Sequence, residues 1–352
     1  MYLAFKEIKK EKLRYGLIVF MIFLISYLIF ILSGLAFGLA SENTQAIYAW
    51  QTKKVILNQN SNVSLSQSLI TKQDVPKKLS TNEALVGQTP LVIKNKKKST
   101  VSAQFIGIKA NQYIYKNLAI TAGRKAKNSN EVVVSQTLKN KGYKLGDKLT
   151  LNGSTDQYKI VGFAKDAMIN IAPIIYGNLA TWRKLRSVNN EVVASGIISK
   201  SSNFKVNSKN LKVYELKTFL NKLPGYSAQN LTFGLMIGFL FIISLIIVAV
   251  FLYILTMQKL PNFAVMRAQG IPSKTLIGFT VSQSFILVLF ASLLALILME
   301  LTVFALPAAV PMKFSPSIAI AGLLGMLIMG IIGSLIPVRS ILKVDPTMAI
   351  GG

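Results

Sequence analysis

Long apolar runs dominate the pattern of hydrophobic and polar positions along this chain. Residues 15–40 contain no Asp, Glu, Lys or Arg, and similar runs cover residues 231–255, 276–299 and 318–338. An α-helix rises about 1.5 Å per residue, so about 20 residues cross the roughly 30 Å hydrocarbon core of a bilayer. The pattern therefore predicts four transmembrane helices, with both termini on the same side.

The first run also has features of a signal peptide. It follows five basic residues, and Gly38-Leu39-Ala40 could serve as a small-residue cleavage site. The apolar core of a signal peptide is only about 7 to 15 residues long, however. The longer run favours an uncleaved membrane anchor.

Basic residues in the short loops predict the orientation, because Lys and Arg are retained in the cytoplasm. The amino-terminal segment, the loop at 258–274 and the tail carry them, whereas the loop at 301–316 has only Lys313. We therefore expect cytoplasmic termini in the cell membrane and an extracytoplasmic segment at 41–230.

The extracytoplasmic segment shows a mixed α/β pattern. Strands are predicted at 101–108, 131–134, 148–151 and 157–161, with a turn at Asn152-Gly153 between the last two. Short helices are predicted at 136–141, 179–185 and 216–223, the first capped by Ser135. Residues 57–82 and the lysine cluster at 94–98 are predicted to be exposed loops. The fold class is therefore a four-helix membrane protein with an α/β external domain.

Composition and charge narrow the functional classes. The 352 residues include no Cys and no His, which excludes Ser-His-Asp or Cys-His catalysis, disulfides and the usual zinc sites. The net charge of +27 would ordinarily suggest nucleic-acid binding. The predicted topology instead places 29 basic and nine acidic residues in the external segment. We therefore expect no nucleic-acid partner; the lysines form either a solvated surface or one that attracts anionic lipid, wall polymer or ligand.

The cytoplasmic loop offers a site for a partner protein. The chain has no G-x-x-x-x-G-K-[ST] phosphate-binding loop, so uphill transport would need a separate ATPase. Residues 263–269 can form a short helix along the membrane surface, which Gly270-Ile271-Pro272 would end. The alternative is a simple basic turn held at the lipid surface.

Several short motifs occur in a consistent order along the whole chain. They are LAFKEIK at 3–9, AGR at 122–124, EVVVS at 131–135, GDK at 146–148, IVGF at 160–163, FAVMRAQGI at 263–271 and KVDPTMAIG at 343–351. Together with the topology, they resemble the FtsX/MacB-like permeases of ABC transporters. The resemblance implies a non-catalytic homodimer that works by mechanotransmission with a separate ATPase. It also implies a coupling helix in the 258–274 loop, with Phe263, Val265, Met266, Arg267 and Gly270 as candidate coupling residues.

Two glycine pairs are candidate helix-packing or dimer positions. Gly34 and Gly38 in the first span, and Gly234 and Gly238 in the second, have the G-x-x-x-G spacing that lets helices approach closely. Ordinary packing within one subunit is the alternative.

Within the family, the length and the opening EKLRYG at 11–16 are most similar to the HrtB haem-efflux subfamily. In that subfamily, haem is thought to enter near the outer ends of the first two spans, where tyrosine is implicated. Tyr226 is similar to one such position, and a phenolate can ligate ferric haem. The alternative role of Tyr226 is an interfacial anchor. A second expected tyrosine is Ile169 here, which either weakens the haem assignment or shifts ligation elsewhere.

The hypothesis is a permease subunit of an ATP-driven exporter of haem or a similar amphipathic toxic compound. It has no metal site and no permanently bound cofactor, uses ATP only through its partner, and contacts membrane lipid. The alternatives are an FtsX-like regulator of cell-wall hydrolases and a permease for antimicrobial peptides or lipids.

The predicted segments are 1–14 (cytoplasmic), 15–40 (first span), 41–230 (external), 231–257 (second span), 258–274 (coupling loop or helix), 275–300 (third span), 301–316 (outer loop), 317–338 (fourth span) and 339–352 (tail).

Overall fold

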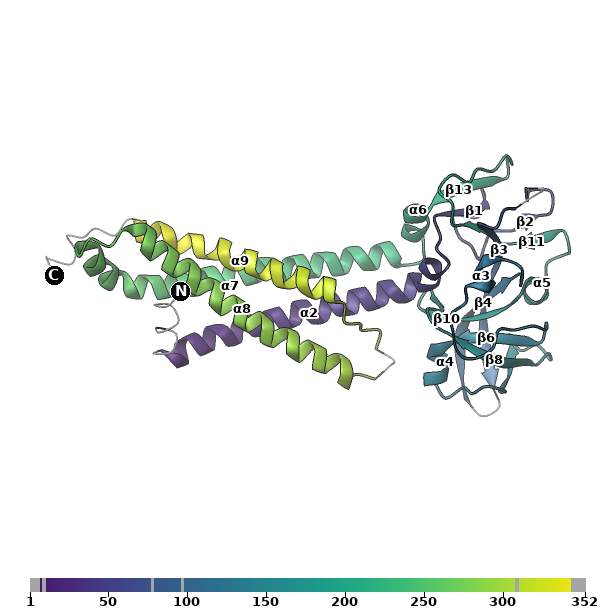
Figure 1. Cartoon of the computed structure of the whole chain (residues 1–352), viewed down its shortest axis with the longest axis horizontal. Helices are drawn as coiled ribbons and strands as arrows, with labels where there is room; N and C mark the ends of the chain where they lie inside the picture. Colours follow the sequence, from purple (N-terminus) through teal and green to yellow (C-terminus); the bar gives the residue numbers. More distant parts are fainter. Residues whose placement is uncertain (1–6, 8–10, 77–78, 96–97, 308–309, 343–352) are drawn as a thin grey trace. The chain divides into compact units, whose positions relative to one another are not determined.

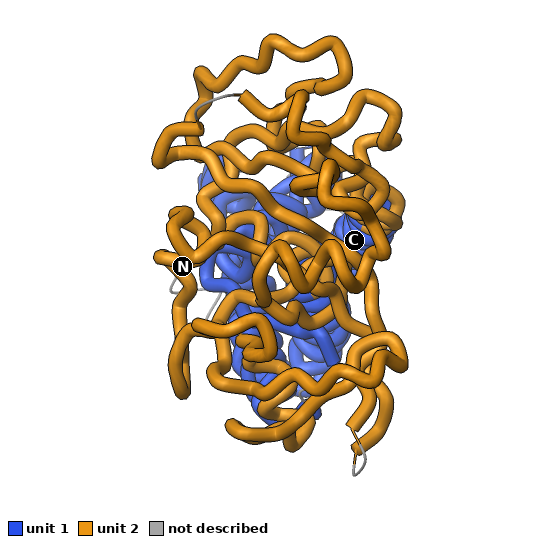
Figure 2. Tube along the Cα trace, turned by 90° about the vertical axis from the view of Figure 1, so that its right-hand side faces the viewer, with its two compact units in different colours: residues 1–38, 230–352 blue, residues 39–229 orange. Residues whose placement is uncertain are grey.

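The computed structural model describes residues 7, 11–76, 79–95, 98–307 and 310–342. The chain divides into two compact units, coloured separately in Figure 2. The first contains residues 1–38 and 230–352, and the second contains residues 39–229. The motif at 343–351 and most of the motif at 3–9 lie outside the described residues.

Four long helices supply the regular structure of the first unit (Figure 1). They are α2 (Lys12–Ala49), which continues into the second unit, α7 (Tyr226–Ala268), α8 (Ser273–Ala305) and α9 (Pro316–Leu342). Each is long and apolar enough to cross a membrane. Residues such as Ile22, Leu252 and Val288 form their shared core. The four predicted spans are thus confirmed as helices.

The predicted coupling helix is not a separate helix in the structure. Helix α7 continues without a break from Tyr226 to Ala268 and includes Pro261. A proline removes one i→i−4 hydrogen bond and usually kinks or breaks a helix. Here the helix continues because the residues beyond Pro261 are held by packing, since Phe263 and Ala264 are both buried.

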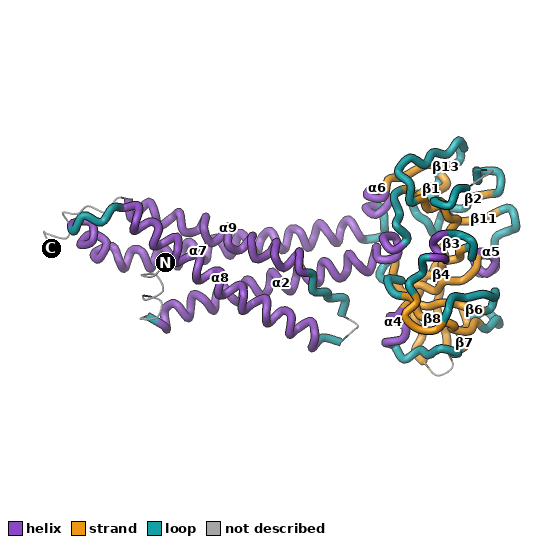
Figure 3. Tube along the Cα trace, viewed as in Figure 1, coloured by secondary structure: helices purple, strands orange, loops and turns teal. Residues whose placement is uncertain are grey.

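The second unit contains strands and short helices (Figure 3). Its main sheet has the order β13-β1-β12-β3-β4-β10-β6-β8-β5; β7 pairs with β3 and β8, β9 pairs with β10, and β2 pairs with β11 in a separate ribbon. The strands are β1 (Lys54–Asn58), β2 (Ile70–Thr71), β3 (Glu83–Asn95), β4 (Lys98–Ile108), β5 (Ile120–Gly123), β6 (Glu131–Ser135), β7 (Lys148–Leu151), β8 (Tyr158–Ala164), β9 (Met168–Ile169), β10 (Ala172–Asn178), β11 (Val192–Ala194), β12 (Gly196–Ser199) and β13 (Leu211–Glu215). The short helices are α3 (Tyr113–Lys116), α4 (Gln136–Asn140), α5 (Leu179–Arg186) and α6 (Leu216–Asn221).

Six of these strands close into a ring. The pairings run β3-β4-β10-β6-β8-β7 and return to β3 through Ile93, which faces Leu151. Alternate side chains of a strand point to one face, and in this ring they fill a core that includes Phe105, Val134 and Ile160. A second core contains Trp50, which donates a hydrogen bond to the Tyr176 hydroxyl.

The capping and turn residues in the sequence correctly predicted most of the short helices and turns of this unit. Ser135 caps α4 by accepting from the Thr137 N–H, and Asn152 and Gly153 both have positive φ. The segment at 57–82 differs from its predicted exposed loop, because Leu65 and Ile70 are buried and β2 forms there. These two side chains pack with other buried residues of the unit, a contact that local polarity does not report.

Two of the short motifs, AGR at 122–124 and EVVVS at 131–135, have structural roles in this unit. Arg124 forms a two-pronged salt bridge with Glu131, at 2.8 and 2.5 Å. Side-chain bonds from Arg124 and backbone bonds from Lys127 and Asn128 lower the pKa of Glu131 to about 2. Gly123 has a φ of +78°, and a Cβ there would collide with the Val161 carbonyl. The AGR motif ends β5 and the EVVVS motif forms β6. The Arg124–Glu131 salt bridge therefore links these two strands, and the close packing at Gly123 holds β5 against β8.

We predict that Glu131→Gln lowers the thermal midpoint of this unit by a few degrees at pH 7. Because the folded pKa of Glu131 lies below its ordinary value of about 4.3, its stabilisation is complete above that pH and is lost as the pH falls toward 2. The difference from wild type should shrink over that window. Tryptophan fluorescence can measure it, since both tryptophans, Trp50 and Trp182, lie in this unit.

Glu191→Gln is the matched control, because Glu191 pairs with Lys72 at 3.3 Å while both side chains are more than half exposed. Exposed pairs contribute little, so this variant should unfold like wild type. An equal effect of the two variants, or a Glu131→Gln effect that persists at pH 2, would contradict the assignment.

Candidate functional site

The turn between α7 and α8 ends the longest helix with a defined cap. The Gly270 N–H donates to the Arg267 carbonyl, and the Ile271 N–H donates to the Met266 carbonyl, both at 3.0 Å. This is the Schellman pattern, which needs a left-handed residue after the helix. Gly270 supplies it with a φ of +87°. Pro272 then precedes α8, so Gly270-Ile271-Pro272 ends the helix as predicted.

The five candidate coupling residues divide into buried and exposed groups. Phe263 is buried against Leu276 and Ile341, and Met266 packs beside them. The Arg267 guanidinium donates to the Ser273 hydroxyl across the turn at 2.5 Å. Val265 is not part of this cluster and is 46% exposed. The turn is therefore a fixed structure with an exposed apolar side chain.

A buried polar cluster lies among the described residues near the same turn. The Lys259 ammonium pairs with Glu7 and donates a 2.6 Å hydrogen bond to the Tyr15 hydroxyl, which also accepts from Gln283. Its nitrogen lies 5.3 Å from the Tyr15 ring centroid and 5.7 Å from that of Phe279. A charge among apolar helices is costly unless it is paired. This cluster joins the amino-terminal segment, α2, α7 and α8.

Tyr226 begins α7 and packs on the core of the second unit. Gly225, with a φ of +73°, precedes it, and the Tyr226 N–H donates to the Leu223 carbonyl at 3.1 Å. Its ring is half-buried. Burial raises the pKa of Tyr48, in the last turn of α2, above its ordinary value, and the neighbouring Tyr226 raises it further. Ile169, where a second tyrosine was expected, is buried.

The two glycine pairs have different surroundings. A Cβ at Gly34 would meet the Met299 side chain, and one at Gly38 would collide with the Pro311 backbone. This pair therefore packs within one subunit. Nothing lies within 4 Å of a Cβ built at Gly234 or Gly238, so the second pair faces open space on α7.

Sequence patterns missed Lys259 and Tyr48 as candidate site residues. Lys259 counted only as a loop charge, although a lysine that directly follows an apolar run needs a partner if the helix continues. Tyr48 lay beyond the predicted first span, and only the extension of α2 to Ala49 reveals it as part of that helix.

The sequence is similar to known permeases over its whole length. Residues 234–346 match the family FtsX-like permease C-terminal. The chain is 28% identical over 356 residues to a protein of Staphylococcus haemolyticus that is provisionally named hemin transport system permease protein HrtB. It is 26% identical over 359 residues to a protein of the same name from Staphylococcus epidermidis. Both alignments cover 100% of this chain and 99% of the relative.

Two solved structures are similar to about half of this chain. The match with the periplasmic region of MacB from Actinobacillus actinomycetemcomitans covers 47% of this chain and 90% of the MacB chain. The sequence identity is 15% and the TM-score is 0.35. The match with the extracellular domain of the ABC-type transporter YknZ from Gram-positive bacteria covers 50% of this chain and 94% of the YknZ chain. The sequence identity is 13% and the TM-score is 0.33. The chain thus matches the FtsX-like permease C-terminal family over residues 234–346 and is similar over its full length to relatives named as hemin transport permeases.

Proposed function

We propose that this chain is the permease subunit of an exporter that removes haem, or a similar amphipathic toxic compound, from the cell membrane. The observation that carries the proposal is the full-length alignment with two relatives named as hemin transport permeases. In this proposal the termini and the α7–α8 turn are cytoplasmic. A separate ATPase hydrolyses ATP, and the permease converts its movement into motion of the external domain.

The continuity of α7 supports mechanotransmission. Its 43 residues correspond to about 65 Å of helix. A helix that bent at residue 258 would lose movement at the bend, whereas one that continues past Pro261 passes it along its axis. The Lys259 cluster joins this helix to α2 and α8, so the three helices respond together.

The exposed side of the α7–α8 turn is suited to ATPase docking. Val265 is exposed, while the buried Phe263 beneath it holds the turn in place. An apolar side chain on a rigid turn can enter a partner's groove at low entropic cost.

We predict that Val265→Asp prevents co-purification of the ATPase and abolishes ATP hydrolysis coupled to the permease, because a charge would be buried without a partner. Its thermal midpoint should match wild type. Leu13→Asp is the control, since Leu13 is 92% exposed on the same predicted side. ATPase binding by Val265→Asp at wild-type level would contradict the docking surface.

The open glycine pair on α7 is suited to a homodimer contact. Gly234 and Gly238 lie among exposed apolar residues such as Leu235 and Phe239. In a two-fold dimer, a residue near the axis meets its own copy. Gly34 and Gly38 already pack within the subunit and are not available for this contact.

We predict that Gly238→Cys forms a disulfide-linked dimer in membranes treated with a mild oxidant. The natural chain has no cysteine, so the background is zero. Ile320→Cys, on the exposed face of α9 (58% exposed), should remain monomeric on the same gel. Equal cross-linking at both positions would indicate random collision and would refute the α7 contact.

Tyr226 and Tyr48 together support haem as the substrate. Two phenol groups close to one another, one at the start of α7 and one near the end of α2, can bind ferric iron without histidine. In this proposal Tyr48 supplies the second phenol, in place of the tyrosine that was expected at position 169.

We predict that haemin stimulates ATP hydrolysis by the complete complex, and that Tyr226→Phe or Tyr48→Phe raises the half-maximal haemin concentration about fivefold, equivalent to about 1 kcal/mol. Tyr253→Phe, an exposed tyrosine farther along α7, should behave like wild type. Stimulation by a peptide but not by haemin would exclude haem as the substrate. Co-purification of a cell-wall hydrolase without any stimulation would favour a regulatory function.

A further inference from the structure

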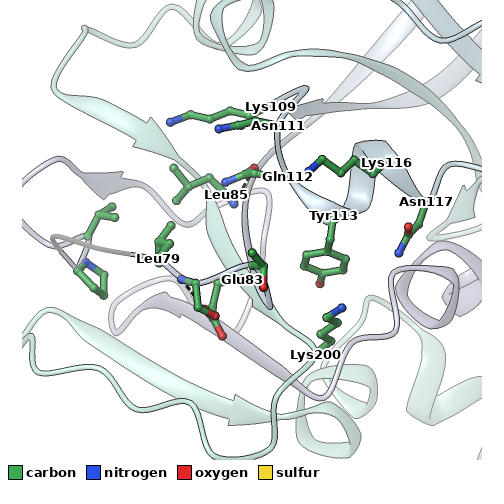
Figure 4. A pocket seen from close by; sticks show the side chains of 14 residues that line it. Leu79, Glu83, Leu85, Lys109, Asn111, Gln112, Tyr113, Lys116, Asn117 and Lys200 are labelled. Carbon is green, nitrogen blue, oxygen red and sulfur yellow. Dashed lines mark hydrogen bonds between the residues drawn. The ribbon is translucent and has the colours of Figure 1, made fainter.

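A pocket of about 570 Å³ opens in the external unit (Figure 4). Its walls come from the residues that precede and begin β3, from residues 109–117 after β4, and from Lys200 after β12. The volume lies within the range of about 300 to 1,000 Å³ that is typical of small-molecule sites. All of these residues belong to one unit, and neither Tyr226 nor Tyr48 is among them.

The pocket is positively charged. Lys109, Lys116 and Lys200 line it, against the single carboxylate of Glu83. Among the described residues, no carboxylate forms a salt bridge with any of these lysines. Figure 4 shows Lys109 and Lys116 on one side and Lys200 on the opposite side, below Tyr113. An anion in this pocket would therefore be attracted by lysines from more than one wall.

Glu83 is already occupied by internal hydrogen bonds. One carboxylate oxygen accepts from the Ser80 N–H at 2.9 Å and from the Ser80 hydroxyl at 2.5 Å. The other accepts from the Ser199 hydroxyl at 3.2 Å. Glu83 therefore fixes the turn that begins β3, and its charge is partly compensated before a ligand enters.

Tyr113 provides an unused donor in this pocket. The side chain is 7% exposed, and within the described part of the chain its hydroxyl has no hydrogen-bond partner. The Lys200 ammonium lies 5.3 Å from the centre of its ring. Burial raises the pKa of Tyr113 above its ordinary value, so the hydroxyl keeps its proton at neutral pH. A buried hydroxyl without a partner is unfavourable, and a ligand oxygen would satisfy it.

The remaining wall is apolar. Val75, Pro76, Leu79 and Leu85 line the pocket beside the lysines. A pocket with an apolar wall and a few convergent polar groups favours a ligand that has both characters. A free inorganic anion would leave this wall in contact with water.

We propose that this pocket is a binding site for a small organic anion, with its acidic group held by Lys200 and the Tyr113 hydroxyl, its apolar body against Leu79 and Leu85, and the positive charge of Lys109 and Lys116 on the same walls attracting it. The site is separate from the tyrosine pair and does not depend on haem export. Its occupant would bind to the external domain from the water phase.

Carboxyfluorescein is a suitable probe, because it is a water-soluble aromatic carboxylate that can be followed by fluorescence anisotropy. The full chain in nanodiscs of neutral phosphatidylcholine should bind it saturably. We expect the double variant Lys109→Gln/Lys200→Gln to raise the Kd about tenfold, and Tyr113→Phe to raise it about threefold to tenfold. Tyr113→Phe keeps the ring, so its thermal midpoint should match wild type.

Lys165→Gln with Lys139→Gln is the matched control, since both lysines are exposed in the same unit but do not line the pocket. An equal loss of binding in this control would mean that general surface charge holds the probe, and would overturn the proposal. Competition separates the chemical classes: 2-naphthoate should displace the probe at concentrations where inorganic phosphate does not. Equal displacement by phosphate would overturn the organic part of the assignment. Failure of haemin to stimulate ATP hydrolysis would leave these results unaffected.

Discussion

The absence of water inside the bilayer is the constraint on which this structure depends. Every backbone N–H and C=O that crosses hydrocarbon must be hydrogen-bonded within the protein, and an α-helix meets this requirement within a single segment. Polar side chains follow the same requirement: Ser26 bonds to Ser292, and the Ser284 hydroxyl donates to the Gly330 carbonyl. Lys259 is the costliest case, and it is retained in a cluster with Glu7, Tyr15 and Gln283. The cluster places the Lys259 side chain where four segments of the membrane unit meet.

The spans and the local turns could be predicted from sequence because each depends on residues that are near one another in the chain. Gly270 is followed by Pro272, and together they mark a helix end whatever the rest of the protein does. Such signals predicted the end of α7 correctly. They did not reveal that α7 passes through Pro261, because that depends on Phe263 packing against Leu276 and Ile341 from other helices.

Strand β3 shows the same limit in the external unit. Its 13 residues include Pro90, which argues against a central strand. Pro90 is tolerated because β3 changes its second partner there: β12 pairs with residues 83–86, and β7 pairs with residues 93–94. The position therefore needs no donor on that side. Local composition does not predict this change of strand partner, because it depends on residues far away in the sequence. For the same reason, local composition did not predict that Glu83, Tyr113 and Lys200 line one pocket.

The closed ring of strands limits how another protein could add to this sheet. A strand that is paired on both sides has no free backbone groups to offer, and ring closure removes free edges from its members. In the described strand order, β13 and β5 are the terminal strands of the main sheet. They have five and four residues, and β5 contains the tightly packed Gly123. Partners that bind by strand addition therefore have little backbone to pair with, and the external domain is protected from edge-to-edge aggregation in the crowded space outside the membrane.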